Sequence, residues 1–324
     1  MKKTFIFLVV VSLLLFFSGC TQNKQNNDKG YAQKTLTINC GKAYNPILQV
    51  IKFMDLLPPL LPDDVSVEWT ALATGDASRD AMVAGYLDIA GISIAFSISA
   101  IENGLPLQII SGSAVVPVYV VSTKDNIRKL SDLNSNSKIT IPGKGTFQHF
   151  AFASKCKELF NNSMLFDSQL VPIPSADVIG FMQTSNDYDA FVIAFPEISR
   201  IPNDMKYYMV EDLEQFCMEK GLSLYIVAAE KFVHNNPVLV MAFRKACEQA
   251  VDLLLNNTDE MAALLSDWYE VDADAIANCI RQCPPRLELS GYDDVAMLMY
   301  EMGMLSKPPR KFIELSNYND IPKE

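Results

Sequence analysis

Apolar residues follow two patterns along the chain: they alternate over short runs and recur every three or four positions over longer ones. Alternation is typical of strands, and the longer spacing is typical of amphipathic helices. In the first third of the chain the two patterns follow each other three times, which predicts a mostly parallel α/β sheet. The predicted strands cover 35–40, 65–69, 87–90 and 107–110, and the predicted helices cover 46–54, 76–84 and 94–103.

The stretch from 82 to 95 joins one of these helices to the next. Gly85 stands where a helix end needs a left-handed residue, and 87–90 form a short apolar strand. Gly91 permits a close approach to the backbone, and Ser93 can cap the helix that follows. A strand that passes through glycine into a capped helix is how open α/β sheets build ligand crevices.

A second set of strands and helices begins near residue 137. Its first strand, 138–141, leads into a glycine-rich turn at 142–149. That turn lacks the G-x-x-x-x-G-K-[ST] sequence of phosphate loops, which argues against nucleotide hydrolysis. Ser175 is expected to cap a helix at 176–183. Further strands are predicted at 170–173, 191–194 and 222–228, and further helices at 237–255, 258–269, 272–283 and 292–302.

The turns that lead from strand to helix are polar or glycine-rich in both halves of the chain. Parallel strands bring such turns to one edge of a sheet. Each helix N-terminus there presents unpaired N–H groups and about half a positive charge. An edge of this kind favours an anionic group.

The first 19 residues are not expected to belong to the fold. Two lysines precede an apolar run that ends at Phe17, as in a secretory signal peptide. The following Ser18-Gly19-Cys20 resembles the cleavage site of bacterial lipoproteins, in which Cys20 carries the lipid. An ordinary signal peptide with a chance cysteine is the alternative. Residues 20–34 are expected to form a disordered tether, because the polar run at 21–30 has nothing to bury.

Composition narrows the classes of function. The formal net charge of −11 argues against nucleic acid and against a polybasic membrane contact. His149 and His234, the two histidines, are far apart in sequence, and no cysteines form a C-x-x-C pair. Neither a metal nor a cofactor is therefore expected. The six cysteines after Cys20 are expected to be buried free thiols rather than disulfides.

Several stretches, taken in order, carry a family resemblance. Residues 85–90 resemble the motif G-x-x-D-[IV]-[GA], and 103–110 resemble a G-x-P-[IVL]-x-x-[IV] strand. Residues 127–133 resemble the [IL]-x-x-[IL]-x-D-L segment that opens a second lobe, 138–146 a K-[IV]-x-[VI]-P-x-x-G-[ST] turn, and 189–192 a D-A strand. Together they resemble the substrate-binding lipoproteins of ABC importers, in the nitrate, sulfonate, taurine and thiamine-precursor group, over nearly all of the mature chain.

The resemblance implies a type II periplasmic-binding-protein-like fold. This is an α/β fold of two lobes, each a mostly parallel sheet flanked by helices, with the ligand cleft between them. The implied divisions are a lipoprotein signal peptide at 1–19, a lipidated tether at 20–34, the first part of lobe one at 35–122, lobe two at 123–220, and a return to lobe one with C-terminal helices at 221–324.

The ligand-binding residues that the resemblance implies stand at strand-to-helix turns in both lobes. Phe147, Phe195 and Tyr44 would form a wall for an apolar or heteroaromatic ligand, and Glu197 would pair with a cationic amine. For each residue the alternative is a turn or cap without ligand contact, and Asp88 is expected to be structural, holding the turn at Gly91. The implied residues are Tyr44, Asn45, Thr74, Gly75, Ser93 and Ser113 in lobe one, and Thr146, Phe147, His149, Phe195 and Glu197 in lobe two.

The implied function is that of a solute-binding lipoprotein of an ABC importer, which captures a small anionic or zwitterionic solute by lobe closure. It would be a non-enzymatic monomer, lipid-anchored through Cys20 on the extracytoplasmic face of the cell membrane. Its partners would be the permease and ATPase subunits. Two alternatives stay open: an enzyme on the same fold, of menaquinone- or thiamine-precursor metabolism, and a surface sensor without a transport partner.

Overall fold

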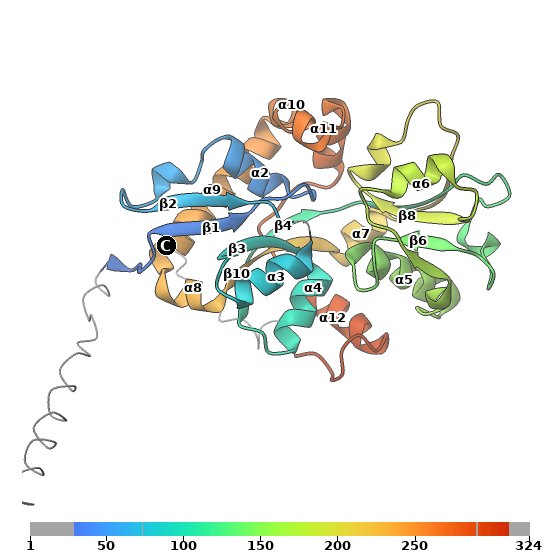
Figure 1. Cartoon of the computed structure of the whole chain (residues 1–324), viewed down its shortest axis with the longest axis horizontal. Helices are drawn as coiled ribbons and strands as arrows, with labels where there is room; N and C mark the ends of the chain where they lie inside the picture. Colours follow the sequence, from blue (N-terminus) through green and yellow to red (C-terminus); the bar gives the residue numbers. More distant parts are fainter. Residues whose placement is uncertain (1–28, 73, 290, 311–324) are drawn as a thin grey trace, which may run out of the picture.

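The computed structural model describes residues 29–310, except 73 and 290. The expected signal peptide, the lipidation site Cys20 and most of the expected tether lie outside these residues. The described chain forms two α/β lobes, which lie side by side along the longest axis of the molecule (Figure 1).

Lobe one is built on a five-stranded sheet in the order β2-β1-β3-β10-β4. Strands β1, β2 and β3 are parallel, and β10 alone runs against its neighbours β3 and β4. The mostly parallel sheet is therefore confirmed. The strands are β1 (Thr35–Asn39), β2 (Ser66–Thr70), β3 (Ile89–Ser93), β4 (Leu107–Val115) and β10 (Ser223–Ala229).

Lobe two repeats this arrangement in the order β7-β6-β8-β5-β9. Strands β6, β7 and β8 are parallel, and β5 runs against β8 and β9. The strands are β5 (Val118–Ser122), β6 (Ile139–Ile141), β7 (Leu170–Pro172), β8 (Ala190–Ala194) and β9 (Tyr208–Asp212).

The chain crosses from one sheet to the other between β4 and β5. The expected end of the first lobe-one segment, residue 122, is therefore too late, because β5 pairs entirely with lobe-two strands. The division between β4 and β5 falls at Pro117, which has no N–H to donate and so interrupts the hydrogen bonding between strands within one long apolar run. Its carbonyl instead accepts a hydrogen bond from the Phe195 N–H at 3.1 Å, in lobe two.

Helices cover both sheets. In lobe one, α2 packs against α9 and α10, and α4 packs against α3 and α12. The helices of lobe one are α2 (Pro46–Phe53), α3 (Gly75–Val83), α4 (Ile94–Glu102), α8 (Glu230–Asn235), α9 (Pro237–Asn256), α10 (Thr258–Tyr269), α11 (Ala273–Gln282) and α12 (Tyr292–Glu301). Those of lobe two are α5 (Phe147–Phe160), α6 (Val178–Thr184), α7 (Glu214–Lys220) and the 3-10 helices η3 (Leu130–Asp132), η4 (Asp167–Gln169) and η5 (Glu197–Arg200). None of the helices in the described part of the chain is both long and apolar enough to cross a membrane.

Local sequence signals placed several of these elements correctly. Gly85 ends α3 with a φ of 80°, and the Ser93 hydroxyl caps α4. Asn45 caps α2, with Pro46 in its first turn, and the Asn45 amide makes the close approach expected at Gly91. A Cβ at Gly91 would lie 1.9 Å from Asn45 Nδ2. The described cysteines after Cys20 are buried free thiols, as expected.

Two local expectations are wrong. Ser175 does not cap α6, which begins three residues later and has no side-chain cap. The tether does not extend to residue 34, because the Tyr31 ring is buried and its hydroxyl donates to Asp64 at 2.7 Å. Asn236 also accepts hydrogen bonds from the N–H groups of 32 and 33. The polar composition that predicts disorder ends at Gly30, one residue before this anchor.

Asp88 is structural, but it holds a different element from the one expected. Its carboxylate accepts hydrogen bonds from the Thr37 N–H at 2.8 Å and from Gln33 Nε2 at 2.5 Å. It therefore fastens the start of β3 to β1 rather than the turn at Gly91.

The segment between α11 and α12 lies directly against β4, close to the crossing to lobe two. Gly112 donates to the Leu287 carbonyl at 2.9 Å, and Arg286 donates to the Ser113 carbonyl at 2.9 Å. A Cβ at Gly112 would lie 2.5–3.0 Å from three backbone oxygens, those of Glu288, Arg286 and Leu287. Only glycine permits this contact, so it fixes where the C-terminal helices sit.

Replacing Gly112 with alanine is expected to lower the free energy of unfolding by about 1–3 kcal/mol, because backbone oxygens cannot move aside as a side chain can. Gly180→Ala is the matched control. Gly180 lies in α6 with no atom within 4 Å of a Cβ, so alanine there should raise stability by about 0.5–1 kcal/mol. Urea unfolding of both variants measures the difference, and equal effects would contradict the contact at Gly112.

Candidate functional site

Three buried aromatic rings meet where the lobes touch. Tyr44 lies in the loop between β1 and α2, Phe195 follows β8, and Tyr269 ends α10. The Tyr44 ring centroid is 4.8 Å from that of Phe195, edge to face, and 5.4 Å from that of Tyr269. The structure thus brings together two of the predicted aromatic residues across the lobes. Phe147, the third, is half-buried at the start of α5 and packs on the core.

Asn45 ties the lobe-one side of this junction together. Its Oδ1 accepts hydrogen bonds from Ser113 Oγ at 2.8 Å and from the Leu48 N–H at 3.4 Å. Its backbone N–H donates to the Tyr269 hydroxyl and to Gln49 Oε1, both at 3.2 Å. The Tyr269 hydroxyl in turn donates to Gln49 Oε1 at 2.5 Å.

Sequence reasoning placed Asn45 and Ser113 at the site but missed two of their partners. Gln49 carried one usable signal, since it is a polar residue between Leu48 and Val50 in a helix that is otherwise largely apolar. Tyr269 carried no such signal, because it is 220 residues from Gln49 in the sequence and looks like any other aromatic residue of an amphipathic helix.

Two polar groups of this junction have no hydrogen-bond partner. The Tyr44 hydroxyl and the Asn45 Nδ2 amide are buried and unpaired, in residues whose exposed fractions are 3% and 5%. The thiol of Cys279, a weak hydrogen-bonding group, lies beside the Tyr44 hydroxyl. Burial raises the pKa of Tyr44 well above its usual value, so the hydroxyl keeps its proton at neutral pH. The Tyr44 hydroxyl therefore has only this weak partner, and the Asn45 amide nitrogen, which packs against the backbone at Gly91, has none among the described residues.

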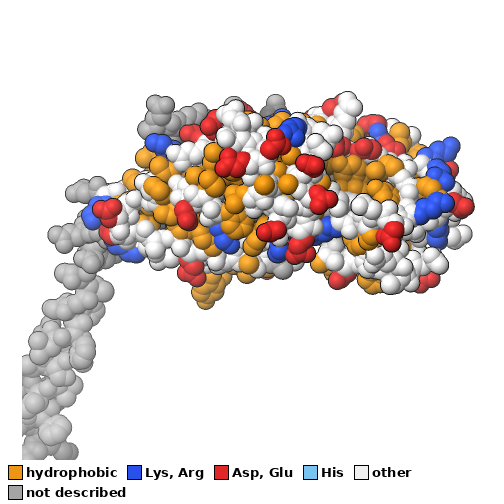
Figure 2. All heavy atoms as spheres, turned by 90° about the horizontal axis from the view of Figure 1, so that it is seen from above, with side chains coloured by type: hydrophobic (Ala, Val, Ile, Leu, Met, Phe, Trp, Pro, Cys, Tyr) orange, Lys and Arg blue, Asp and Glu red, His pale blue; other side chains and the backbone are white. Residues whose placement is uncertain are grey.

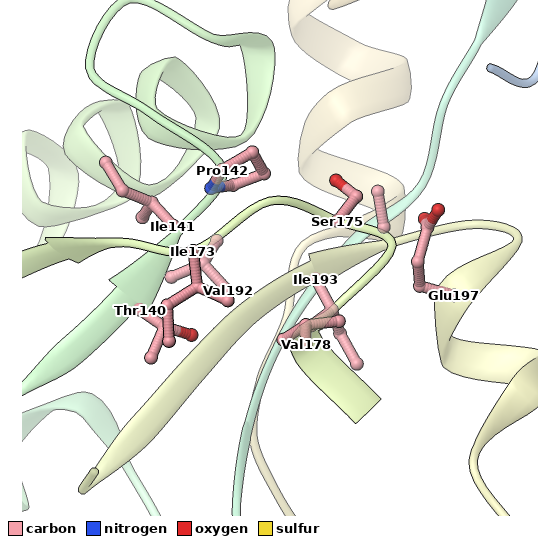
Figure 3. Close-up of a pocket in the computed structure, with 10 residues that line it drawn as sticks. Thr140, Ile141, Pro142, Ile173, Ser175, Val178, Val192, Ile193 and Glu197 are labelled. Atoms are coloured by element: carbon pink, nitrogen blue, oxygen red, sulfur yellow. The ribbon is translucent and has the colours of Figure 1, made fainter. Parts of the chain in front are cut away.

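In lobe two, a hollow lies at the carboxyl edge of the parallel strands β6, β7 and β8 (Figure 3). Its walls are mostly apolar, and Glu197 supplies the one ionisable side chain among its lining residues. From above, hydrophobic side chains also gather in a recess on the lobe-two half of the molecule (Figure 2). The lining residues of the hollow are Thr140, Ile141, Pro142, Ile173, Ser175, Val178, Val192, Ile193, Ala194 and Glu197.

Glu197 is a carboxylate in a poor environment for charge. Its side chain is 15% exposed, and burial is the main cause that raises its pKa. Its own backbone N–H and the Arg200 guanidinium oppose that rise. The nearest guanidinium nitrogen is 3.7 Å from Glu197 Oε1, which is too long for a good hydrogen bond.

Arg200 directs its other nitrogens across the junction. Nε and Nη2 donate to the Tyr269 carbonyl at 2.9 and 2.5 Å. That carbonyl belongs to the last residue of α10, where a helix leaves its final carbonyls unpaired and carries a partial negative charge. Arg200 therefore links lobe two to the C-terminal helices of lobe one, and sequence reasoning did not single it out.

The glycine-rich turn before α5 uses its polar groups internally. The Thr146 hydroxyl donates to the Gly143 carbonyl at 2.8 Å and accepts from the His149 N–H at 3.3 Å. His149 Nδ1 accepts from the Gly145 N–H at 3.0 Å, and Nε2 lies 3.5 Å from Asp167. Burial lowers the pKa of His149, so the ring is neutral in this setting. These contacts favour a capping role for Thr146 and His149.

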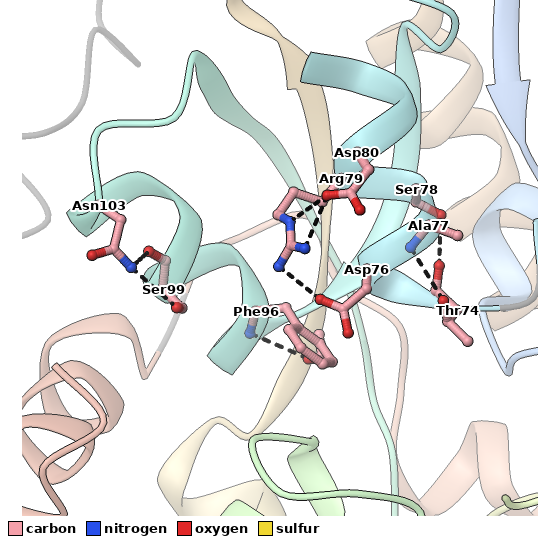
Figure 4. A network of polar contacts seen from close by, with 10 residues as sticks. Thr74, Asp76, Ala77, Ser78, Arg79, Asp80, Phe96, Ser99 and Asn103 are labelled. Atoms are coloured by element: carbon pink, nitrogen blue, oxygen red, sulfur yellow. Dashed lines mark hydrogen bonds and ion pairs between the residues drawn. The ribbon is translucent and has the colours of Figure 1, made fainter. Parts of the chain in front are cut away.

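The remaining predicted residues of lobe one cap α3 and α4. The Thr74 hydroxyl accepts from the Ala77 N–H at 3.1 Å, and Ser93 Oγ accepts from the Phe96 N–H at 3.4 Å. The Phe96 ring lies 3.2 Å from where a Gly75 Cβ would be. Figure 4 shows Arg79 between Asp76 and Asp80 in the same helix. Asp76 lies in the first turn of α3, so this N-terminus already has a negative neighbour.

Comparison with protein-family models gives no match, and comparison with curated proteins gives none. Solved structures do match. The alkanesulfonate-binding protein SsuA from Xanthomonas axonopodis pv. citri has a TM-score of 0.72 at 19% identity, over 86% of this chain and 96% of its own. The aliphatic sulphonate binding protein SsuA from Escherichia coli has a TM-score of 0.69 at 18% sequence identity, and the match covers 86% of this chain and 90% of that protein. The nitrate-binding protein NrtA from Synechocystis PCC 6803 has a TM-score of 0.63 at 14% sequence identity, and the match covers 90% of this chain and 86% of that protein.

The chain has the periplasmic-binding-protein fold. At these identities the likeness is one of fold, and the sulfonate and nitrate ligands are those of the matched proteins. Within the binding-protein fold of this chain, the junction of Tyr44, Phe195 and Tyr269 lies between the lobes, next to the hollow that Glu197 lines.

Tyr44→Phe is expected to leave the unfolding free energy of the ligand-free protein unchanged or to raise it by about 1 kcal/mol, because an unpaired buried hydroxyl costs about 1–3 kcal/mol. Tyr269→Phe is the matched control. It removes a hydroxyl with two partners and should lower stability by about 1–2 kcal/mol. Chemical denaturation of both variants measures this, and similar losses in the two would show that Tyr44 is bonded in the folded protein.

The buried His149 is expected to make stability depend on pH. Because its pKa is lowered on folding, its contribution is complete above the unfolded value of about 6.5 and is lost as pH falls through the folded value. His149→Gln should therefore lose less stability than the parent between pH 7 and pH 5. His234→Gln, at an exposed histidine, should keep the parent slope. If His234→Gln lost less stability between pH 7 and pH 5 than His149→Gln, His149 would not be the cause of the pH dependence.

Proposed function

We propose that this protein is the solute-binding component of an ABC importer and captures a small solute between its lobes. One observation carries the proposal most directly: Tyr44 of lobe one meets Phe195 of lobe two at a buried junction, where the Tyr44 hydroxyl has only the weak thiol of Cys279 beside it. Buried polar groups in native proteins are almost always paired, so a buried group with no strong partner calls for an explanation, and a bound solute is one. The solute-binding names of the structural neighbours support the same conclusion.

Capture would work by closure. The lobes already touch through the Tyr44–Phe195 ring pair and through Arg200 on the Tyr269 carbonyl. A solute that bonds groups of both lobes has contacts only in the closed form, so it shifts the population towards closure. The inner contact set is proposed as Tyr44, Asn45, Ser113, Phe195 and Glu197, with Thr74, Gly75, Ser93, Thr146, Phe147 and His149 shaping the surrounding turns.

The protein is proposed to act as a receptor and not as an enzyme. A nucleophilic cysteine needs a lowered pKa, and burial raises the pKa of each described cysteine, for example to about 11 for Cys40 and about 12 for Cys156. We further propose export by the 1–19 signal peptide, lipidation at Cys20, a monomeric state, and delivery of the solute to a permease and ATPase at the extracytoplasmic membrane face.

The test is whether a solute both stabilises and compacts the protein. Mass spectrometry of small molecules released from the purified native protein should identify a solute. Adding it back at about 100 times its dissociation constant should raise the unfolding free energy by about 2.7 kcal/mol. Small-angle scattering should show a smaller radius of gyration.

Tyr86→Ser serves as the control, because Tyr86 is 80% exposed and belongs to no described contact at the junction. It should bind and compact like the parent. A protein that yields no solute, and that no member of a broad solute library stabilises, is not a solute receptor.

A further inference from the structure

We propose that Arg200 is a latch that stabilises the closed form of the protein before any solute binds. The latch consists of the two hydrogen bonds from the Arg200 guanidinium to the Tyr269 carbonyl. The inference concerns the solute-free protein, so it goes beyond the proposed capture of a solute and holds whatever the solute is. It follows from how each end of the latch is anchored and from where the latch lies in the fold.

The donor end of the latch is anchored in lobe two. Arg200 is the last residue of η5, the short helix that follows β8. The next residue, Ile201, is buried in the apolar cluster of lobe two, and Ile198 packs against the same cluster. Close-packed cores resist displacement of their residues. Arg200 therefore moves with lobe two as a unit.

The acceptor end is anchored as firmly in lobe one. The Tyr269 ring is fully buried, and its hydroxyl bonds both Gln49 Oε1 and the Asn45 N–H. The Tyr269 carbonyl ends α10, where the partial negative charge of a helix C-terminus attracts a cation. Arg200 Nε and Nη2 bond this carbonyl at 2.9 and 2.5 Å. The two hydrogen bonds therefore join a fixed point of one lobe to a fixed point of the other.

The latch lies on the side of the sheets where open α/β folds form their crevices. Arg200 comes after the carboxyl end of β8, and Tyr44, whose ring touches that of Tyr269, comes after the carboxyl end of β1. Crevices in such folds lie outside the carboxyl ends of the strands. Separating the lobes at these turns would therefore break both hydrogen bonds of Arg200, together with the contact between the Tyr44 and Phe195 rings.

A second contact between the lobes lies at the turn before α5. Met304, in the segment after α12, has its Cε 3.6 Å from where a Gly145 Cβ would be, and α4 packs against α5. Because α12 itself packs on α4, Met304 reaches this turn from lobe one. The contact is apolar and needs no solute. The latch thus acts on lobes that already meet at two places, and it adds charged, directional bonds to the closed form.

A closed form that is stabilised without a solute changes what the solute must supply. The apparent affinity of a ligand is reduced in proportion to the fraction of protein in the binding-competent form. A bond that raises the closed fraction in advance therefore strengthens the binding of any solute and does not select among solutes. Arg200 would set the strength of capture, and the residues that contact the solute would set its identity.

The experiment measures the radius of gyration by small-angle scattering, on protein freed of solute by unfolding and refolding. Arg200→Gln removes both the charge and the pair of donors, and Arg200→Lys keeps the charge. Arg79→Gln is the matched control, because the Arg79 side chain is 31% exposed, compared with 25% for Arg200, and pairs with Asp76 and Asp80 of its own helix. Circular dichroism establishes that each variant is folded.

Arg200→Gln should lower the ratio of closed to open protein by roughly tenfold, the effect of losing a hydrogen bond to a charged group, and so enlarge the solute-free protein. Arg200→Lys should lie between Arg200→Gln and the parent, because a cation at the end of α10 keeps part of the attraction. Arg79→Gln should have the radius of the parent.

A radius of folded Arg200→Gln equal to that of the parent overturns the latch, and so does an equal expansion of Arg79→Gln. If Arg200→Gln does not fold, Arg200→Lys decides, and a radius equal to the parent's overturns the latch. A solute identified from the native protein should compact Arg200→Gln to the size of the solute-bound parent, with a dissociation constant up to about tenfold higher. Weaker binding with an unchanged solute-free radius would assign Arg200 to the solute and overturn the latch. Failure to find a solute counts against the proposed function alone, because the solute-free comparison uses none.

Discussion

Beside the junction with lobe two, the packing of lobe one depends on the side chain of Asn45. It caps α2, holds β4 through Ser113, and presses its Nδ2 against β3 at Gly91. Its backbone N–H adds α10 through the Tyr269 hydroxyl. Four elements that are distant in sequence are therefore fixed by one residue, and the amide pays for this with a donor that it cannot pair within the protein.

The link between the lobes has a different physical basis. Arg200 places a charge at the carboxyl end of α10, where the helix dipole and unpaired carbonyls favour a cation, with a stabilisation of about 0.3–2 kcal/mol. Because this contact does not involve a solute, it lowers the free energy that a solute must supply for closure. It also explains why Glu197 is left with a partial counter-charge: a guanidinium that bonds a carbonyl with two nitrogens cannot turn to form a paired contact with a carboxylate.

The sequence was sufficient to predict the structural features that depend only on residues close together in the chain. The caps at Asn45, Ser93 and Thr146 and the C-terminal helices were predictable because capping and helical periodicity act over a few positions. The crossing between β4 and β5 was misplaced, since an apolar run does not show which of two sheets it joins. Arg200 and Tyr269 could not be found in this way. Their importance comes from a contact between residues 69 apart, and nothing local distinguishes either one.

The predicted site was inferred from local signals, and it differs from the site that the structure supports, which depends on contacts between distant residues. A row of helix N-termini suggested an anion, but at α3, α4 and α5 the first turn is already capped by Thr74, Ser93 or Thr146. Asp76 also adds a negative charge to the first turn of α3. Each cap removes part of the attraction that a free N-terminus would have for an anion. Selectivity at the junction then depends on side chains rather than on free helix N-termini, and the polar side chains with unused capacity there include Tyr44, Asn45 and Thr140, beside the partly compensated carboxylate of Glu197.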